Sequence, residues 1–261
     1  MLFDTHAHYD DERFDEDRDT LLASMPENNV GLILNPGCDV ESSRKAVSYA
    51  NRYPFVYAAV GLHPENIEAG WTDALAEIRR LAKSEPRVRA IGEIGLDYYW
   101  EKDERARTRQ QVVFARQMEL ARELKMPVIV HDRDAHADCL EITRRYPDVT
   151  GVYHCYAGHV EMARELLERG YYLSFTGVIT FKNAKKVHES AKAVASDRIL
   201  TETHCPYLTP EPFRGVFPNE PKNVNHTLAN LALLREEKEE ELERQILENA
   251  ERLFFRLKTK K

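Results

Sequence analysis

The chain has 261 residues, of which 43% are hydrophobic and 31% are charged, and its formal net charge is −7. This length and balance are typical of a soluble globular enzyme with a sizeable core, and they fall within the range of a single α/β barrel. The negative charge disfavours binding to long duplexes or membrane surfaces by bulk electrostatics, because proteins that do so are normally basic.

Short apolar runs rich in β-branched residues recur along the chain, and such runs are typical of buried parallel strands. Apolar residues at helical spacing lie in several of the gaps, over 75–81, 114–124 and 160–167. Eight strand-like runs alternating with helices favour a closed barrel over an open sheet, so we predict an α/β fold of the (β/α)8 TIM-barrel type. The runs begin near Leu2 and continue at 31–34, 55–60, 88–91, 128–130, 149–153, 171–175 and 198–200.

Beyond the eighth run the chain changes character. Prolines between Pro206 and Pro221 indicate a long loop, and residues 239–257 have the pattern of an amphipathic helix. No Gly-rich or Ser-rich linker separates two parts of the chain. We therefore predict one hydrolase domain over residues 1–261, a barrel that ends in C-terminal helices.

Potential metal ligands follow several of the apolar runs, where a parallel barrel displays its catalytic side chains. They are His6, His8, Glu93, His131 and His154. His6 and His8 alternate with one residue between them, so on a strand both imidazoles would face the same side. Neutral imidazole is a common ligand of divalent metals, and a carboxylate can bridge two cations ~3.5–4 Å apart. The pattern predicts a binuclear metal hydrolase.

The expected location is the cytosol. No apolar run approaches the ~20 residues that span a bilayer, and the first residues lack the basic region and apolar stretch of a secretory signal. The four cysteines are far apart and form no CxxC pair, so we expect reduced thiols and no membrane association.

Six motifs in a fixed order make the chain similar to a known family. Together they resemble the TatD family of metal-dependent deoxyribonucleases, in the amidohydrolase superfamily, from residue 1 to about residue 257. They are DTHAH at 4–8, GLHP at 61–64, GEIGLDY at 92–98, HDR at 131–133, HCYAG at 154–158 and TETHCPYLTP at 201–210.

The resemblance implies a (β/α)8 barrel that holds two divalent metal ions of the Mg, Mn or Zn class. It assigns His6 and His8 to one ion and makes Glu93 the bridge. It assigns His131 and His154 to the second ion.

The chain departs from the family pattern at two places. Where the family has an aspartate that is both a ligand and the proton acceptor for the attacking water, this chain has His204. We expect His204 to remain a metal ligand but to weaken the catalytic base. After Arg214-Gly215 the family continues with a basic residue, whereas Val216-Phe217-Pro218 stands here. This second change is expected to alter phosphate contacts or substrate preference.

Three further residues are candidates for substrate contact. His63 resembles a family residue that contacts the substrate or transition state; the alternative is a strand-end histidine bonded to nearby backbone. Arg133 is the best candidate for a phosphate clamp, because a guanidinium offers fixed paired donors; the alternative is a solvated surface arginine. Arg214 is a weaker candidate, because its loop departs from the family pattern.

The leading functional hypothesis is a metal-dependent hydrolase that cleaves phosphodiester bonds of DNA exonucleolytically, on single strands or chain ends. Two alternatives stay open. The same chemistry could hydrolyse an ester or amide on a nucleotide or aminoacyl-tRNA, because a metal-activated water also attacks carbonyl carbon. His204 also supports a catalytically impaired homologue that still binds metal or nucleic acid.

Overall fold

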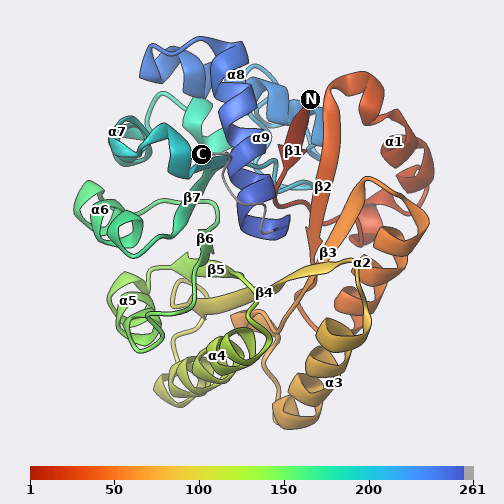
Figure 1. Cartoon of the computed structure of the whole chain (residues 1–261), viewed down its shortest axis with the longest axis vertical. Helices are drawn as coiled ribbons and strands as arrows, with labels where there is room; N and C mark the ends of the chain where they lie inside the picture. The colour runs from red at the N-terminus through yellow and green to blue at the C-terminus, as the bar shows by residue number, and fades with distance from the viewer. Residues whose placement is uncertain (256–261) are drawn as a thin grey trace. The chain divides into compact units, whose positions relative to one another are not determined.

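The computed structural model describes residues 1–255. In this part of the chain eight strands run parallel to their neighbours, and their order in the sheet is the order of the chain (Figure 1). The strands are β1 Leu2–Asp4, β2 Val30–Pro36, β3 Val56–Val60, β4 Val88–Asp97, β5 Val128–Arg133, β6 Gly151–Tyr153, β7 Tyr172–Phe175 and β8 Ile199–Thr201.

Each strand is followed along the chain by an α-helix, and one further helix comes last. This eightfold alternation confirms the predicted (β/α)8 class and the C-terminal helices. The helices are α1 Arg18–Ser24, α2 Val40–Arg52, α3 Trp71–Ser84, α4 Glu104–Leu124, α5 His136–Arg144, α6 Val160–Glu168, α7 Lys185–Ala193, α8 Val224–Arg235 and α9 Glu239–Phe255. The last two residues predicted for the final helix, 256 and 257, lie outside the described residues.

The described residues form two compact units, one of residues 1–35 and 155–255 and the other of Pro36–His154. In the first, β1 packs against α9, and Phe3 lies 5.8 Å from Phe254 between ring centroids. In the second, β4 and β5 form a buried centre to which Ile91 and Val130 contribute. The single domain over residues 1–261 stays a prediction. None of the described helices has the length and apolarity needed to span a membrane.

Strand β4 is longer than the apolar run 88–91 that predicted it. It continues through the GEIGLDY motif to Asp97 and pairs with β5, so that Gly95 lies opposite His131. Gly95 has φ +145°, and a Cβ there would lie 1.9 Å from the carbonyl oxygen of His131. Only glycine fits this approach. The glycines and acids of the motif, up to Asp97, therefore belong to the strand.

Candidate metal-binding clusters

A buried glutamate at the centre of the second unit is surrounded by three histidines. The Oε1 atom of Glu93 lies 2.8 Å from His131 Nδ1, 2.8 Å from His154 Nε2 and 3.3 Å from His63 Nε2. The Glu93 side chain is 3% exposed. We call these four residues the Glu93 cluster; it brings together four of the residues that the sequence selected.

Neighbouring strands position this cluster. Glu93 lies within β4 and His131 within β5, while His154 follows β6 and donates its backbone N–H to Val130 O at 3.2 Å. His63 precedes the short 3₁₀ helix η3, Pro64–Asn66, and its Nδ1 accepts the backbone N–H of Glu65 at 3.3 Å. His63 thus bonds to nearby backbone through one nitrogen and faces Glu93 through the other.

Sequence reasoning missed one contact of Asp97. The Asp97 Oδ1 atom accepts the backbone N–H of Trp100 at 2.9 Å. The other oxygen, Oδ2, lies 3.0 Å from His131 Nε2. A carboxylate on the second nitrogen of a ligand histidine fixes the orientation and tautomer of the ring. The signal was the spacing, because Asp97 is four residues beyond Glu93 on the same strand.

The titration of these groups follows from burial and from their partners. Burial lowers the pKa of His63, which favours the neutral imidazole that metals require. Burial also opposes charge on His131, but its bonds to Asp97 and Glu93 outweigh this and raise the pKa of His131. For Asp97, burial raises the pKa, while the bonds from His131 and Trp100 lower it below its usual value.

Replacing Asp97 by asparagine should weaken metal binding without unfolding the chain. We expect Asp97→Asn to lower divalent-metal affinity about 10- to 100-fold, as loss of such an outer partner typically does. Competition with a chromophoric chelator measures this. The matched control is Asp132→Asn, because Asp132 lies on β5 next to His131 but bonds His136 Nδ1 at 2.8 Å. Equal metal affinity in the two variants would contradict the orienting role of Asp97.

A second cluster lies in the first unit and consists of three imidazoles, those of His6, His8 and His204. His6 Nε2 and His8 Nε2 are 3.1 Å apart. The ring centroid of His204 lies 5.0 Å from that of His6 and 5.4 Å from that of His8. Two nitrogens at this separation can both reach one ion at the ~2.0–2.1 Å typical of Zn–N bonds. We call this set the three-histidine cluster.

The reason given from the sequence for His6 and His8 facing one way is wrong in one respect. Strand β1 ends at Asp4, so both histidines lie after the strand and the alternation of a strand does not apply. Backbone bonds hold them instead. His8 N–H donates to Cys205 O at 2.8 Å, and His204 N–H donates to His6 O at 2.9 Å. The segment after β8 therefore positions the segment after β1.

Asp4 ties these two segments together, a role that the sequence did not assign to it. Its Oδ1 accepts the backbone N–H of Thr203 at 2.9 Å, and its Oδ2 accepts the Thr203 hydroxyl at 2.6 Å. The carboxyl is completely buried, and burial raises the pKa of Asp4 to about 7 despite these bonds. Asp4 therefore fixes the backbone next to His204.

His204 also lies beside a different donor set. Cys155, Glu202 and His204 each offer a ligand atom within 4.8 Å of the others. The Oε1 atom of Glu202 accepts the backbone N–H of Cys155 at 2.9 Å and lies 4.0 Å from His204 Nδ1. Imidazole and thiol are donors that zinc-class ions accept well. Position 204 is thus surrounded by nitrogen, sulfur and oxygen donors.

The two candidate arginines are both exposed and stacked on aromatic rings. The guanidinium carbon of Arg133 lies 4.0 Å from the ring centroid of Tyr99, and that of Arg214 lies 3.9 Å from the ring centroid of Phe181. Stacking restricts a guanidinium while leaving its N–H donors available. Their role as phosphate clamps stays a prediction.

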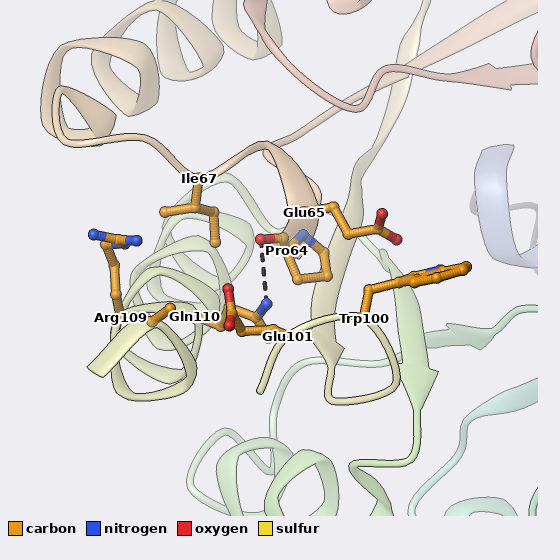
Figure 2. A pocket seen from close by; sticks show the side chains of 8 residues that line it. Pro64, Glu65, Ile67, Trp100, Glu101, Arg109 and Gln110 are labelled. Atoms are coloured by element: carbon orange, nitrogen blue, oxygen red, sulfur yellow. Dashed lines mark hydrogen bonds between the residues drawn. The ribbon is translucent and has the colours of Figure 1, made fainter. Parts of the chain in front are cut away.

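A pocket of about 230 Å³ lies beside the Glu93 cluster in the second unit. It begins at Pro64, one residue after His63, and it includes Trp100, whose backbone bonds to Asp97. Figure 2 shows the Gln110 side chain among the lining residues, where its Nε2 donates to Pro64 O at 3.4 Å. Its lining residues are Pro64, Glu65, Ile67, Trp100, Glu101, Ala106, Arg109 and Gln110.

Comparisons with a family model and with related proteins agree on one family. Residues 3–255 match the model of the family described as TatD related DNase. The chain is 42% identical over 256 residues to a protein of Bacillus subtilis (strain 168) named "Uncharacterized metal-dependent hydrolase YabD", covering 97% of this chain and 99% of that protein. It is 34% identical over 264 residues to the Cronobacter sakazakii (strain ATCC BAA-894) protein named "3'-5' ssDNA/RNA exonuclease TatD", covering 98% of both.

A solved structure agrees with this grouping. The TatD homologue YjjV of Escherichia coli K12 superposes with a TM-score of 0.90 at 29% identity, over 97% of this chain and 98% of that one. This similarity supports the barrel class independently of the strand assignments.

Proposed function

Because this chain belongs to the TatD-related DNase family of metal-dependent hydrolases, we propose that it hydrolyses phosphodiester bonds of DNA. The proposed substrates are single strands or chain ends, cleaved exonucleolytically. The observation that carries the proposal is the convergence of three imidazole nitrogens on one buried carboxylate oxygen of Glu93. The printed name of the Cronobacter relative, a 3'-5' ssDNA/RNA exonuclease, supports this substrate class.

The residues present suit two divalent ions of the Mg, Mn or Zn class. The three-histidine cluster would hold one ion and His131 with His154 the other, and Glu93 is the proposed bridging ligand. Divalent ions at such sites polarise a phosphoryl oxygen and lower the pKa of a bound water. Asp97 keeps the His131 ring in place, and His63 is the proposed contact to the substrate.

The overall charge limits the kind of DNA that fits. With a net charge of −7, the chain has no bulk attraction for a long duplex. Bound cations and local guanidinium groups must therefore supply the affinity for phosphate. Arg133 and Arg214 are the proposed donors, and a short single-stranded end needs few such contacts. A location in the cytosol stays a prediction.

Removing the guanidinium of Arg133 should weaken substrate binding but not metal binding. For Arg133→Ala we expect a higher KM for single-stranded DNA, unchanged metal content, and a salt slope of binding that is smaller by about one. The physical reason is the loss of one phosphate contact and of the counterion release that accompanies it. Arg122→Ala is the control, since this arginine lies on α4 and stacks on Tyr146. An unchanged KM and salt slope in Arg133→Ala would mark Arg133 as a surface residue.

A direct comparison of substrates tests the proposed reaction. The purified chain is incubated with an end-labelled single-stranded oligonucleotide and, separately, with an aminoacyl ester of a nucleotide, under the same metal ions. We expect stepwise release of mononucleotides from the DNA and much slower hydrolysis of the ester. Faster cleavage of the ester would favour acyl chemistry, and DNA binding without turnover at full metal occupancy would favour an impaired homologue.

A further inference from the structure

Exposed apolar side chains gather in the loop after β8, next to the three-histidine cluster. Nine large hydrophobic side chains are exposed in the described part of the chain, and four of them lie within residues 207–217. A concentration of this kind on a soluble protein marks a binding surface. The four are Tyr207, Phe213, Val216 and Phe217, with exposed fractions of 41%, 43%, 58% and 55%.

An arginine from another segment joins two of these rings. The guanidinium carbon of Arg13 lies 5.4 Å from the ring centroid of Tyr207 and 5.0 Å from that of Phe217, and the two rings are 6.1 Å apart. Arg13 Nη1 donates to the Tyr207 hydroxyl at 3.0 Å and to Asp11 Oδ2 at 2.7 Å. We call Arg13, Tyr207 and Phe217 the stacking platform.

Buried polar contacts hold the platform in place. The Asn219 side chain is completely buried, and its Nδ2 donates to Tyr207 O at 2.7 Å and to Thr203 O at 3.1 Å. Its backbone N–H donates to Pro206 O at 2.8 Å. A surface fixed in this way loses little conformational freedom when a ligand binds to it.

The stacking platform lies beside a candidate metal ligand, His204. Tyr207 N–H donates to His204 O at 3.0 Å, and the ring centroids of Tyr207 and His204 are 6.0 Å apart. Successive phosphates of one strand advance by ~3.4 Å along the axis of a duplex and by more in an extended strand. A base placed against Tyr207 or Phe217 would therefore belong to a nucleotide close to any phosphate bound beside His204.

We propose that the stacking platform binds an unpaired nucleobase of a single-stranded DNA end, beside the reacting phosphate. This rests on the proposed nuclease function and assigns it a base-binding subsite. Aromatic faces and guanidinium groups stack on every base, which suits a nuclease without sequence preference. The guanidinium of Arg13 also suits an anionic strand better than it suits a wholly apolar partner.

Binding of a nuclease-resistant phosphorothioate strand separates stacking from turnover. The strand carries 2-aminopurine at its end, and its fluorescence is quenched when the base stacks. We expect Phe217→Ala to raise the Kd about tenfold, within the range for loss of one stacked base, and to reduce the quenching. Phe217→Trp should bind as the parent chain does. Leu233→Ala, a truncation of an exposed apolar side chain on α8, is the matched control and should have no effect.

A DNA strand that lacks the terminal base completes a double-mutant cycle, in which one change is made in the protein and the other in the DNA. The parent chain should bind this abasic strand about tenfold more weakly than the complete strand, and Phe217→Ala should bind both strands equally. Because stacking releases no counterions, the loss in Phe217→Ala should be the same at low and high salt. Additive effects of the protein and strand changes would overturn the proposal.

Two further measurements, of oligomeric state and of cleavage, also test whether the stacking platform binds a nucleobase. If Phe217→Ala converts a dimer to a monomer in sedimentation while its DNA affinity is unchanged, the patch binds a second copy of this chain and the proposal is wrong. Cleavage of the natural strand by the parent chain is measured in parallel. Cleavage without base-dependent coupling refutes the subsite alone, whereas coupled binding without cleavage refutes the proposed nuclease reaction and leaves a base-binding surface.

Discussion

Glu93→Gln should lose most of its bound divalent metal and nearly all of its turnover on single-stranded DNA. The amide keeps the shape of the side chain but carries no negative charge. Only one of its two polar atoms, the oxygen, has a lone pair that can bind a cation. Three histidine nitrogens face the oxygen that would be altered. Loss of an outer partner of a ligand typically costs 10- to 100-fold in metal affinity or activity, so loss of a bridging ligand should cost at least roughly 100-fold.

Metal analysis of the purified variant, together with initial rates at saturating metal, tests this expectation. Glu77→Gln is the matched control, because Glu77 is a carboxylate of the same unit that pairs with Arg44 and Arg80 on the surface. Two ions retained in Glu93→Gln would show that Glu93 is not the bridge. Lost turnover with both ions retained would assign it a different role in the reaction.

His204→Asp should change the preferred metal ion and raise the rate with magnesium. Imidazole is a nitrogen donor, which zinc, cobalt and nickel accept well, whereas magnesium prefers oxygen. A carboxylate at 204 would restore an oxygen ligand and a proton acceptor, and general-base help is worth on the order of 10²–10⁴ in rate. We therefore expect the parent chain to cleave slowly with magnesium and His204→Asp to gain up to that factor.

The backbone conformation at position 204 can be adopted by aspartate, so the substitution is a fair test. His204 has φ 58°, in the left-handed region that aspartate and asparagine also adopt more readily than most residues. His204→Asn is the matched control, because it has the shape of aspartate without the charge. Metal affinities from calorimetry give a readout independent of turnover. Equal magnesium-dependent rates in the parent chain and in His204→Asp would refute the assignment of the catalytic base to position 204.

Spacing and strand-end placement, which are local signals, predicted the fold class and five members of the clusters, His6, His8, Glu93, His131 and His154. His63 and His204 were selected through the resemblance to the TatD family. The eight apolar runs correspond to the eight strands, although the Gly-rich and acid-rich half of β4 was missed. Its pairing with β5 depends on Gly95 meeting the backbone at His131, which no single segment reveals.

Contacts between distant segments could not be predicted from the sequence. The bond between Asp97 and His131 and the bonds from Thr203 to Asp4 join segments 34 and 199 residues apart. The stacking of Arg13 on Tyr207 and Phe217 likewise depends on tertiary structure. The sequence marked the loop after Arg214 as different from the family pattern, but it did not show that Phe217 would lie beside Tyr207 and Arg13.

Metal depletion followed by metal return, on an end-labelled single strand, tests most directly whether this chain is a metal-dependent nuclease. The chain is stripped with a chelator, shown to remain folded by circular dichroism, and then titrated with one divalent ion while bound metal and released nucleotides are both measured. We expect no cleavage by the stripped chain, and cleavage that rises with bound metal and levels off near two ions per chain. Undiminished cleavage by the stripped chain, or no cleavage with two ions bound, would contradict the proposed function.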